Sequence, residues 1–126
     1  FTRVGLSGAD MGAAWLLPRL VGLGRATELL MTGGVIDSRE AHRIGLVNRV
    51  VDDADLPAEA RRLAAALAAG PAEALADTKR ALDDEAALAW PAALEAEAVR
   101  QSVLMDRPDF REAYAAFRER REPRFT

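Results

Sequence analysis

The shortage of strand-forming sequence is the strongest constraint on what this 126-residue chain can fold into. Only three segments, at residues 1–6, 35–36 and 46–51, have the β-branched and aromatic character of strands. A sheet of ordinary size has about four to six strands. The three predicted strands therefore cannot make a self-contained sheet, and the apolar helix expected after the first one needs a partner layer. We interpret the sequence as the C-terminal part of an α/β protein.

Helix-forming sequence fills most of the remaining chain. Apolar residues are dense between residues 11 and 20, and glycines are expected to end this helix and two short ones that follow it. Asp37 precedes Glu40 by three residues, which predicts a capping box in which each side chain binds the other residue's main-chain N–H. Four longer helices are predicted at about residues 56–69, 71–84, 91–105 and 109–120.

The composition excludes several classes of function. The 17 basic and 20 acidic residues give a net charge of −3, which argues against a nucleic-acid partner. Without cysteine there is no disulfide framework or thiolate zinc site, and one histidine leaves little scope for a metal site or a Ser-His-Asp triad. No apolar run approaches the roughly 20 residues of a membrane-spanning helix. We expect a cytoplasmic protein without metal or membrane partner, whose start at Phe1 reflects processing or truncation.

Short motifs along the whole chain resemble the crotonase, or enoyl-CoA hydratase/isomerase, family. The residues Asp10-Met11-Gly12, followed by Trp15-Leu16-Leu17-Pro18-Arg19, resemble the family's D-x-G-x-x-W-L-L-P-R motif. Residues 36–51 resemble its segment I-(S/D)-x-x-E-A-x-x-x-G-L-V-N-x-V-V. Residues 25–33, the Thr78-Lys79 pair and the ending at 109–125 also resemble family patterns, and no single motif carries the resemblance.

The resemblance implies an α/β crotonase (ClpP-like) fold, mostly helical in this part. Residues 1–53 would be the end of the spiral core and residues 54–126 a helical association region. The implied partners are an acyl-CoA substrate and further copies of the chain, in a trimer or a dimer of trimers. The reaction would pass through a thioester enolate, with CoA as part of the substrate and no separate cofactor.

The family's oxyanion-hole donors lie in an N-terminal half that this chain does not match, and such donors supply a large share of the catalysis. We therefore expect the chain alone to be inactive. An alternative is a non-catalytic helical association module, or a remnant that depends on a partner.

Asp10 is the candidate catalytic base. In isomerase-like branches of the family, an aspartate at this place moves a proton along the acyl chain, and burial at the mouth of a thioester site would suit it for that task. Alternatively, or in addition, Asp10 caps the helix that begins near Met11, which is worth about 1 kcal/mol. The glutamate of hydratases is replaced by Phe1, which cannot shuttle a proton and which we interpret as a core aromatic.

Two further groups of residues are candidates through the resemblance. Phe117 and Arg120 match places that contact CoA, where an aromatic ring can lie against adenine and a guanidinium suits a phosphate. The alternative is that Phe117 completes a core stripe with Phe110 and Tyr114, while Arg120 lies on a solvated face. The candidate subunit interface is on the first helix, at Trp15, Leu16 and Arg19.

Overall fold

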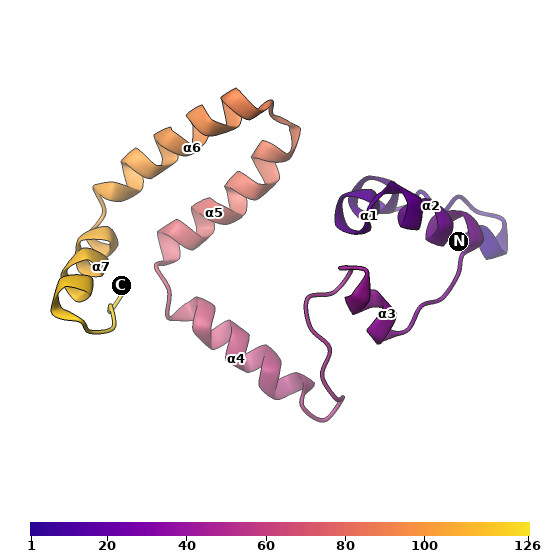
Figure 1. Ribbon diagram of the computed structural model, residues 1–126, viewed down its shortest axis with the longest axis horizontal. Coiled ribbons are helices and arrows are strands. Elements are labelled where there is room, and N and C mark those ends of the chain that lie inside the picture. Colours follow the sequence, from indigo (N-terminus) through magenta and orange to yellow (C-terminus); the bar gives the residue numbers. More distant parts are fainter. The chain divides into compact units, whose positions relative to one another are not determined.

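The computed structural model describes all 126 residues and consists of helices joined by turns and loops (Figure 1). The chain divides into two compact units, Phe1–Asp55 and Leu56–Thr126. The first contains the 3₁₀ turn η1 (Thr2–Val4) and the helices α1 (Ala13–Val21), α2 (Leu23–Thr32) and α3 (Ser38–Arg43). The second contains α4 (Leu56–Ala68), α5 (Ala72–Asp84), the 3₁₀ turn η2 (Glu85–Ala87), α6 (Trp90–Met105) and α7 (Pro108–Glu119). The mostly helical character predicted from the sequence is confirmed.

The three predicted strands are wrong for this chain. The carbonyl of Phe1 accepts hydrogen bonds from the N–H groups of Val4 and Leu6, at 3.0 and 3.1 Å, so residues 1–6 close into a turn. Residues 35–36 lie in the irregular link between α2 and α3, and residues 46–51 form bends and irregular chain. A strand satisfies its N–H and C=O groups on a neighbouring strand, and no extended segment here provides that ladder. The backbone groups therefore find local partners.

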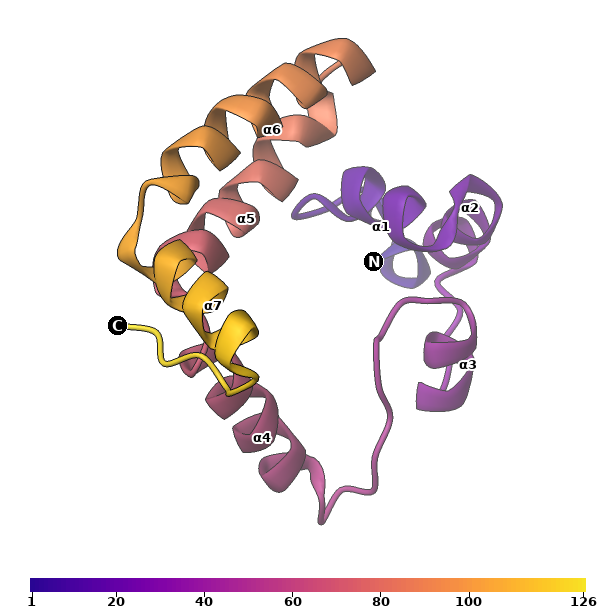
Figure 2. The ribbon, with the colours of Figure 1, turned by 60° about the vertical axis from the view of Figure 1, so that its left-hand side comes forward.

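A close main-chain approach joins the start of the first unit to α2. A Cβ atom added to Gly8 would lie 2.5 Å from the carbonyl oxygen of Leu30, so only glycine allows this contact. The same carbonyl accepts a hydrogen bond from Thr2 Oγ1 at 2.7 Å. Helix α1 packs beside α2 (Figure 2), and Ala26, at 1% exposure, is buried there.

A single glycine joins α1 to α2. The N–H of Gly22 donates to the carbonyl of Pro18 at 3.0 Å and closes α1, while its carbonyl accepts from Ala26 at 3.1 Å and opens α2. Its dihedral angles, φ 81° and ψ 154°, belong to a region that is essentially reserved for glycine. The corner between the two helices therefore depends on this residue.

The predicted capping box before α3 is half correct. Asp37 Oδ1 accepts from the N–H of Glu40 at 2.8 Å, which confirms Asp37 as the N-cap. The Glu40 carboxylate does not reach back to Asp37, because it binds the guanidinium of Arg43 and lies 3.4 Å from that of Arg25 in α2. Two arginines outcompete one main-chain N–H for this carboxylate, and the pair with Arg25 links α3 to α2.

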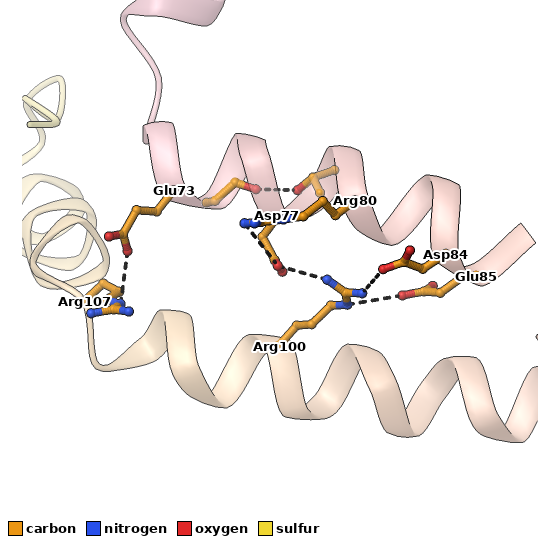
Figure 3. A network of polar contacts seen from close by, with 9 residues as sticks. Glu73, Asp77, Arg80, Asp84, Glu85, Arg100 and Arg107 are labelled. Atoms are coloured by element: carbon orange, nitrogen blue, oxygen red, sulfur yellow. Dashed lines mark hydrogen bonds and ion pairs between the residues drawn. The ribbon is translucent and has the colours of Figure 1, made fainter.

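One arginine holds α5, η2 and α6 together in the second unit (Figure 3). Arg100 of α6 places Nη1 2.9 Å from Asp77 and Nη2 2.7 Å from Asp84, with Nε 3.8 Å from Glu85. Asp77 and Asp84 are seven residues apart, so they share one face of α5 and would repel each other without the cation. A second pair, Arg107 with Glu73 at 3.0 Å, ties the far end of α6 to the start of α5.

The chain buries very little apolar surface. Only Ala26, Ala41 and Ala116 are fully buried, while most of the large apolar side chains are exposed. Phe1, predicted as a core aromatic, is 63% exposed, so that interpretation is wrong for this chain. The accessible surface is 10109 Å², whereas two separate compact proteins of the sizes of the two units would expose about 7,900 Å² together. The helices therefore present faces that suit further packing partners.

The contact at Gly8 gives a test of the first unit. Replacing Gly8→Ala should lower the free energy of unfolding by about 1–3 kcal/mol, because the new methyl group would meet the Leu30 main chain, which cannot move aside cheaply. The matched control is Gly24→Ala, within α2 and with nothing within 4 Å of the added Cβ, which should stabilise by up to about 1 kcal/mol. Urea unfolding of both variants measures the difference, and a Gly8→Ala protein as stable as the parent would disprove the constraint.

Candidate functional site

Asp10 begins a tight turn that leads into α1. Its carbonyl accepts from the N–H of Ala13 at 2.8 Å, and the two residues between them, Met11 and Gly12, both have positive φ, 47° and 86°. This is the φ pattern of a type I′ turn. The Asp10 side chain is exposed and forms no hydrogen bond, and Gly12 is the N-cap. The proposal that the Asp10 carboxylate caps the helix is therefore wrong, because the turn places the first helical residue at Ala13.

The left-handed conformation of Met11 marks this turn as strained. A residue with a Cβ in that conformation costs about 1–2 kcal/mol, and such strain is concentrated at functional sites in known proteins. Met11 is also 95% exposed, so no packing of its side chain within this chain holds it there. Sequence reasoning missed the turn by starting the helix at Met11. The available signal was Asp10 followed two positions later by a glycine, a combination that favours turns with positive φ.

Trp15, Leu16 and Arg19 come together on the exposed side of α1. The Arg19 guanidinium lies 3.8 Å from the centre of the Trp15 ring, and its Nη1 donates to the Trp15 carbonyl at 2.8 Å. The side chains are one helical turn apart, which permits this cation–π contact. Trp15 and Leu16 are each about half exposed, at 50% and 49%. The three residues form a single surface on α1, and their role as a subunit interface stays a prediction.

Phe117 and Arg120 lie at the end of α7, within the second unit. Phe117 is 82% exposed, and Arg120 ends the helix in the left-handed conformation, with φ 56° and ψ 41°. The Arg120 N–H donates to Phe117 at 3.3 Å and the Arg121 N–H donates to Ala116 at 3.0 Å, which is the hydrogen-bond pattern of a Schellman motif. This motif normally uses glycine at the left-handed position, and here an arginine occupies it.

The predicted core stripe of α7 is wrong. Phe110, Tyr114 and Phe117 are 49%, 60% and 82% exposed, so they do not form a core in this chain. The covered face of α7 is the neighbouring stripe instead, which consists of Asp109, Glu112, Ala113, Ala115 and Ala116. Two of these residues are acidic and are covered by the chain that follows the helix. Apolar periodicity could not reveal this face, because polar contacts cover it.

The chain after α7, residues 121–126, folds back onto the helix; we call this segment the C-terminal strap. The Glu112 carboxylate accepts from Arg121 Nη1 at 2.6 Å and Nη2 at 3.0 Å, and from the N–H of Arg124 at 2.8 Å. Farther along, the N–H of Thr126 donates to Asp109 Oδ1 at 3.2 Å. These hydrogen bonds, with Arg121 as the main cause and the Arg124 N–H next, lower the pKa of Glu112 to about 2. The pKa of Arg121 is raised for the same reason.

A mostly apolar cavity of about 400 Å³ lies between α5, α6, α7 and the strap. Phe125 of the strap lines it opposite residues of the three helices, and the ion pair of Glu73 with Arg107 stands at its edge. Its principal apolar lining is Pro71, Ala74, Leu104, Met105, Phe110 and Phe125. Sequence reasoning missed this cavity, because its residues come from four segments that only the folded chain brings together.

No three histidine, cysteine, aspartate or glutamate side chains gather where they could bind a metal ion. None of the helices has the length and apolar character needed to cross a membrane.

The enoyl-CoA hydratase/isomerase family model matches the chain over residues 1–126. This chain therefore belongs to that family, the crotonases. The match extends over both units, so it includes the Asp10 turn as well as α7 and the strap.

Individual relatives agree with the family assignment. The chain is 42% identical over its whole length to a Rhodobacter capsulatus protein described as a probable enoyl-CoA hydratase, covering 49% of it. It is 35% identical to the 1,2-epoxyphenylacetyl-CoA isomerase of Escherichia coli, again over the whole chain and 48% of the relative. A crystal structure of a Streptomyces coelicolor protein described as an enoyl-CoA hydratase superposes with a TM-score of 0.96 at 50% identity, covering 100% of this chain and 46% of that one. The fold is thus of the crotonase type, and the chain spans about half the length of these relatives.

The lowered pKa of Glu112 predicts how acid affects the strap. The pKa falls from an ordinary value of 4.5 to about 2, so the stability that Glu112 contributes is fully present above pH 4.5 and is lost as the pH falls toward about 2. The amide resonances of Arg124 and Thr126, followed by NMR between pH 6 and pH 2, should report release of the strap in that interval. In a Glu112→Gln variant the Arg124 amide resonance should show no such transition, because its acceptor no longer titrates. Release of the wild-type strap near pH 5 would contradict the prediction.

Proposed function

We propose that the protein carrying this chain acts on an acyl-CoA thioester through an enolate and moves a proton along the acyl chain. Asp10 is the proposed base. The observation that supports it is that the Asp10 carboxylate is exposed and has no hydrogen-bond partner, on a backbone that a strained turn holds. A carboxylate with no partner is free to accept a proton, whereas one held by a cap or an arginine is not. We also propose, from the order of the family motifs, that this chain is the C-terminal part of that protein.

In this proposal Asp10 removes a proton from a carbon next to the thioester or its double bond. The electron pair of the broken C–H bond moves toward the thioester carbonyl and gives an enolate, and the proton returns at a different carbon. An isomerase is favoured over a hydratase because Phe1 stands where hydratases carry their second acidic group.

Phe117 and Arg120 are the proposed contacts for the CoA part of the substrate. The exposed Phe117 ring offers a face for adenine to stack against. The Arg120 guanidinium forms no ion pair within the chain and is exposed, so its fork of N–H donors remains available for a phosphate. Both residues lie at the same helix end, which suits recognition of one nucleotide.

Substituting Asp10→Asn tests the proposed base. The proton-transfer rate should fall by ~10² or more, while affinity for the CoA ester hardly changes, because the lost interaction belongs to the transition state. The measurement is isomerisation of enoyl-CoA substrates, with single-turnover kinetics and ester binding recorded separately. Asp53→Asn, an exposed aspartate in the turn before α4, is the matched control and should leave turnover unchanged. Near-normal turnover of the Asp10→Asn protein would remove Asp10 from the mechanism.

We further propose that copies of this chain associate, as a trimer or a dimer of trimers, and that Trp15, Leu16 and Arg19 take part in the contact. The exposed aromatic ring with its stacked arginine resembles the side chains that dominate protein interfaces. Light scattering at micromolar concentration should find an oligomer, and Trp15→Ala should shift it toward smaller species. A stable monomer for the parent protein would contradict the proposal.

A non-catalytic association module is the second candidate. The large exposed apolar surface supports it, because such surface suits partner binding whether or not catalysis occurs. Turnover of acyl-CoA substrates distinguishes the two candidate functions. An association module would form its oligomer and show no turnover of any acyl-CoA substrate, before or after the Asp10→Asn change.

A further inference from the structure

We propose that Glu112 is a positioning residue that locks the C-terminal strap and thereby keeps Arg120 in its left-handed conformation, with the Arg120 side chain free for an anion. The Glu112 carboxylate accepts hydrogen bonds from three donors of the strap. Glu112 Oε1 accepts from both Arg121 Nη1 and the Arg124 N–H, and Oε2 accepts from Arg121 Nη2. A single side chain of α7 thus holds the strap through a side chain and through the backbone.

The contacts of Arg121 leave its guanidinium little freedom. Besides the two bonds to Glu112, its Nε donates to Glu119 at 2.6 Å. Two parallel N–H···O bonds fix the plane of a guanidinium relative to its carboxylate, which a single ion pair does not. Glu112 has 25% and Arg121 39% of its side chain exposed, so the paired geometry of the bonds, rather than exclusion of water, gives them their directionality.

Arg120 stands between two fixed points. Its own N–H and that of Arg121 close the end of α7, and the next residue, Arg121, is clamped by Glu112. A residue other than glycine persists in the left-handed region only where its surroundings hold it. Without the clamp, we expect the strap to leave the helix and Arg120 to relax toward negative φ.

The hydrogen bonds of Glu112 also give the neighbouring residues Arg120 and Arg121 different roles. Arg121 is neutralised by Glu112 and Glu119, so it cannot serve an outside anion. Arg120 has no acidic partner within the chain, and its guanidinium projects from a backbone that the lock keeps rigid. The ligand in question, a phosphate of coenzyme A, rests on the function proposed above, but the lock itself does not.

The first experiment measures the lock without any ligand. Trypsin cleavage after Arg120, Arg121 and Arg124 should accelerate roughly tenfold or more in Glu112→Gln, the expected effect of losing charge-assisted hydrogen bonds on local opening. Glu122→Gln is the matched control, because the Glu122 side chain is exposed and makes no hydrogen bond or ion pair, and its cleavage after Arg120 and Arg124 should match the wild type. Arg121→Lys keeps the positive charge but loses the paired N–H donors of the guanidinium, so its cleavage should accelerate as in Glu112→Gln. This second variant tests the proposal if Glu112→Gln does not fold. Unchanged cleavage in both lock variants would overturn the proposal.

The second experiment links the lock to the ligand by a double-mutant cycle with free coenzyme A as the probe. Arg120→Ala and Glu112→Gln should each weaken binding and raise KM for CoA esters, and the double variant should bind no worse than Arg120→Ala alone. Additive losses would show that Glu112 acts independently of Arg120 and would overturn the positioning role. If Arg120→Ala binds normally while Glu112→Gln still releases the strap, the CoA role of Arg120 is wrong and the lock stands.

Discussion

In the second unit, arginines bind carboxylates on other segments of the chain at three places. Arg100 joins α6 to α5, Arg107 joins the end of α6 to the start of α5, and Arg121 joins the strap to α7. Ala116 is the only buried residue of this unit, so little apolar burial is available to fix these contacts. Orientation is therefore set by the directional geometry of guanidinium–carboxylate pairs. The exposed apolar faces are left for contacts outside the chain.

This arrangement explains which parts of the fold the sequence predicts. The ends of the helices follow local chemistry, so Gly22 and Gly33 mark boundaries that the structure confirms. The N-cap at Asp37 is equally local. Strands are different, because a strand exists only where a second strand pairs with it, and neither residues 1–6 nor residues 46–51 have such a neighbour.

In the candidate site too, local features can be predicted from the sequence and long-range features cannot. The sequence motifs single out Asp10, Phe117 and Arg120, but they do not reveal the left-handed turn at Met11 or the left-handed end of α7. Both features place a side chain where the usual residue would be glycine. Neither the strap nor the cavity beside it could be predicted, because Glu112 meets Arg121 and Arg124 only after the chain reverses direction. The periodicity of apolar residues predicts the wrong face of α7 as the core, because the face that is covered is partly acidic.

The corner at Gly22 has a consequence for the length of the chain between α1 and α2. Because one residue both closes the first helix and opens the second, no loop is available to absorb an insertion or a deletion. One extra residue continued as helix would rotate everything after it by about 100°, the angle between successive residues of an α-helix. Ala26 would then leave the contact with α1, and Leu30 would lose its place against Gly8. The spacing between these two helices is therefore fixed in residue number, whereas the irregular links on either side of α3 can vary in length.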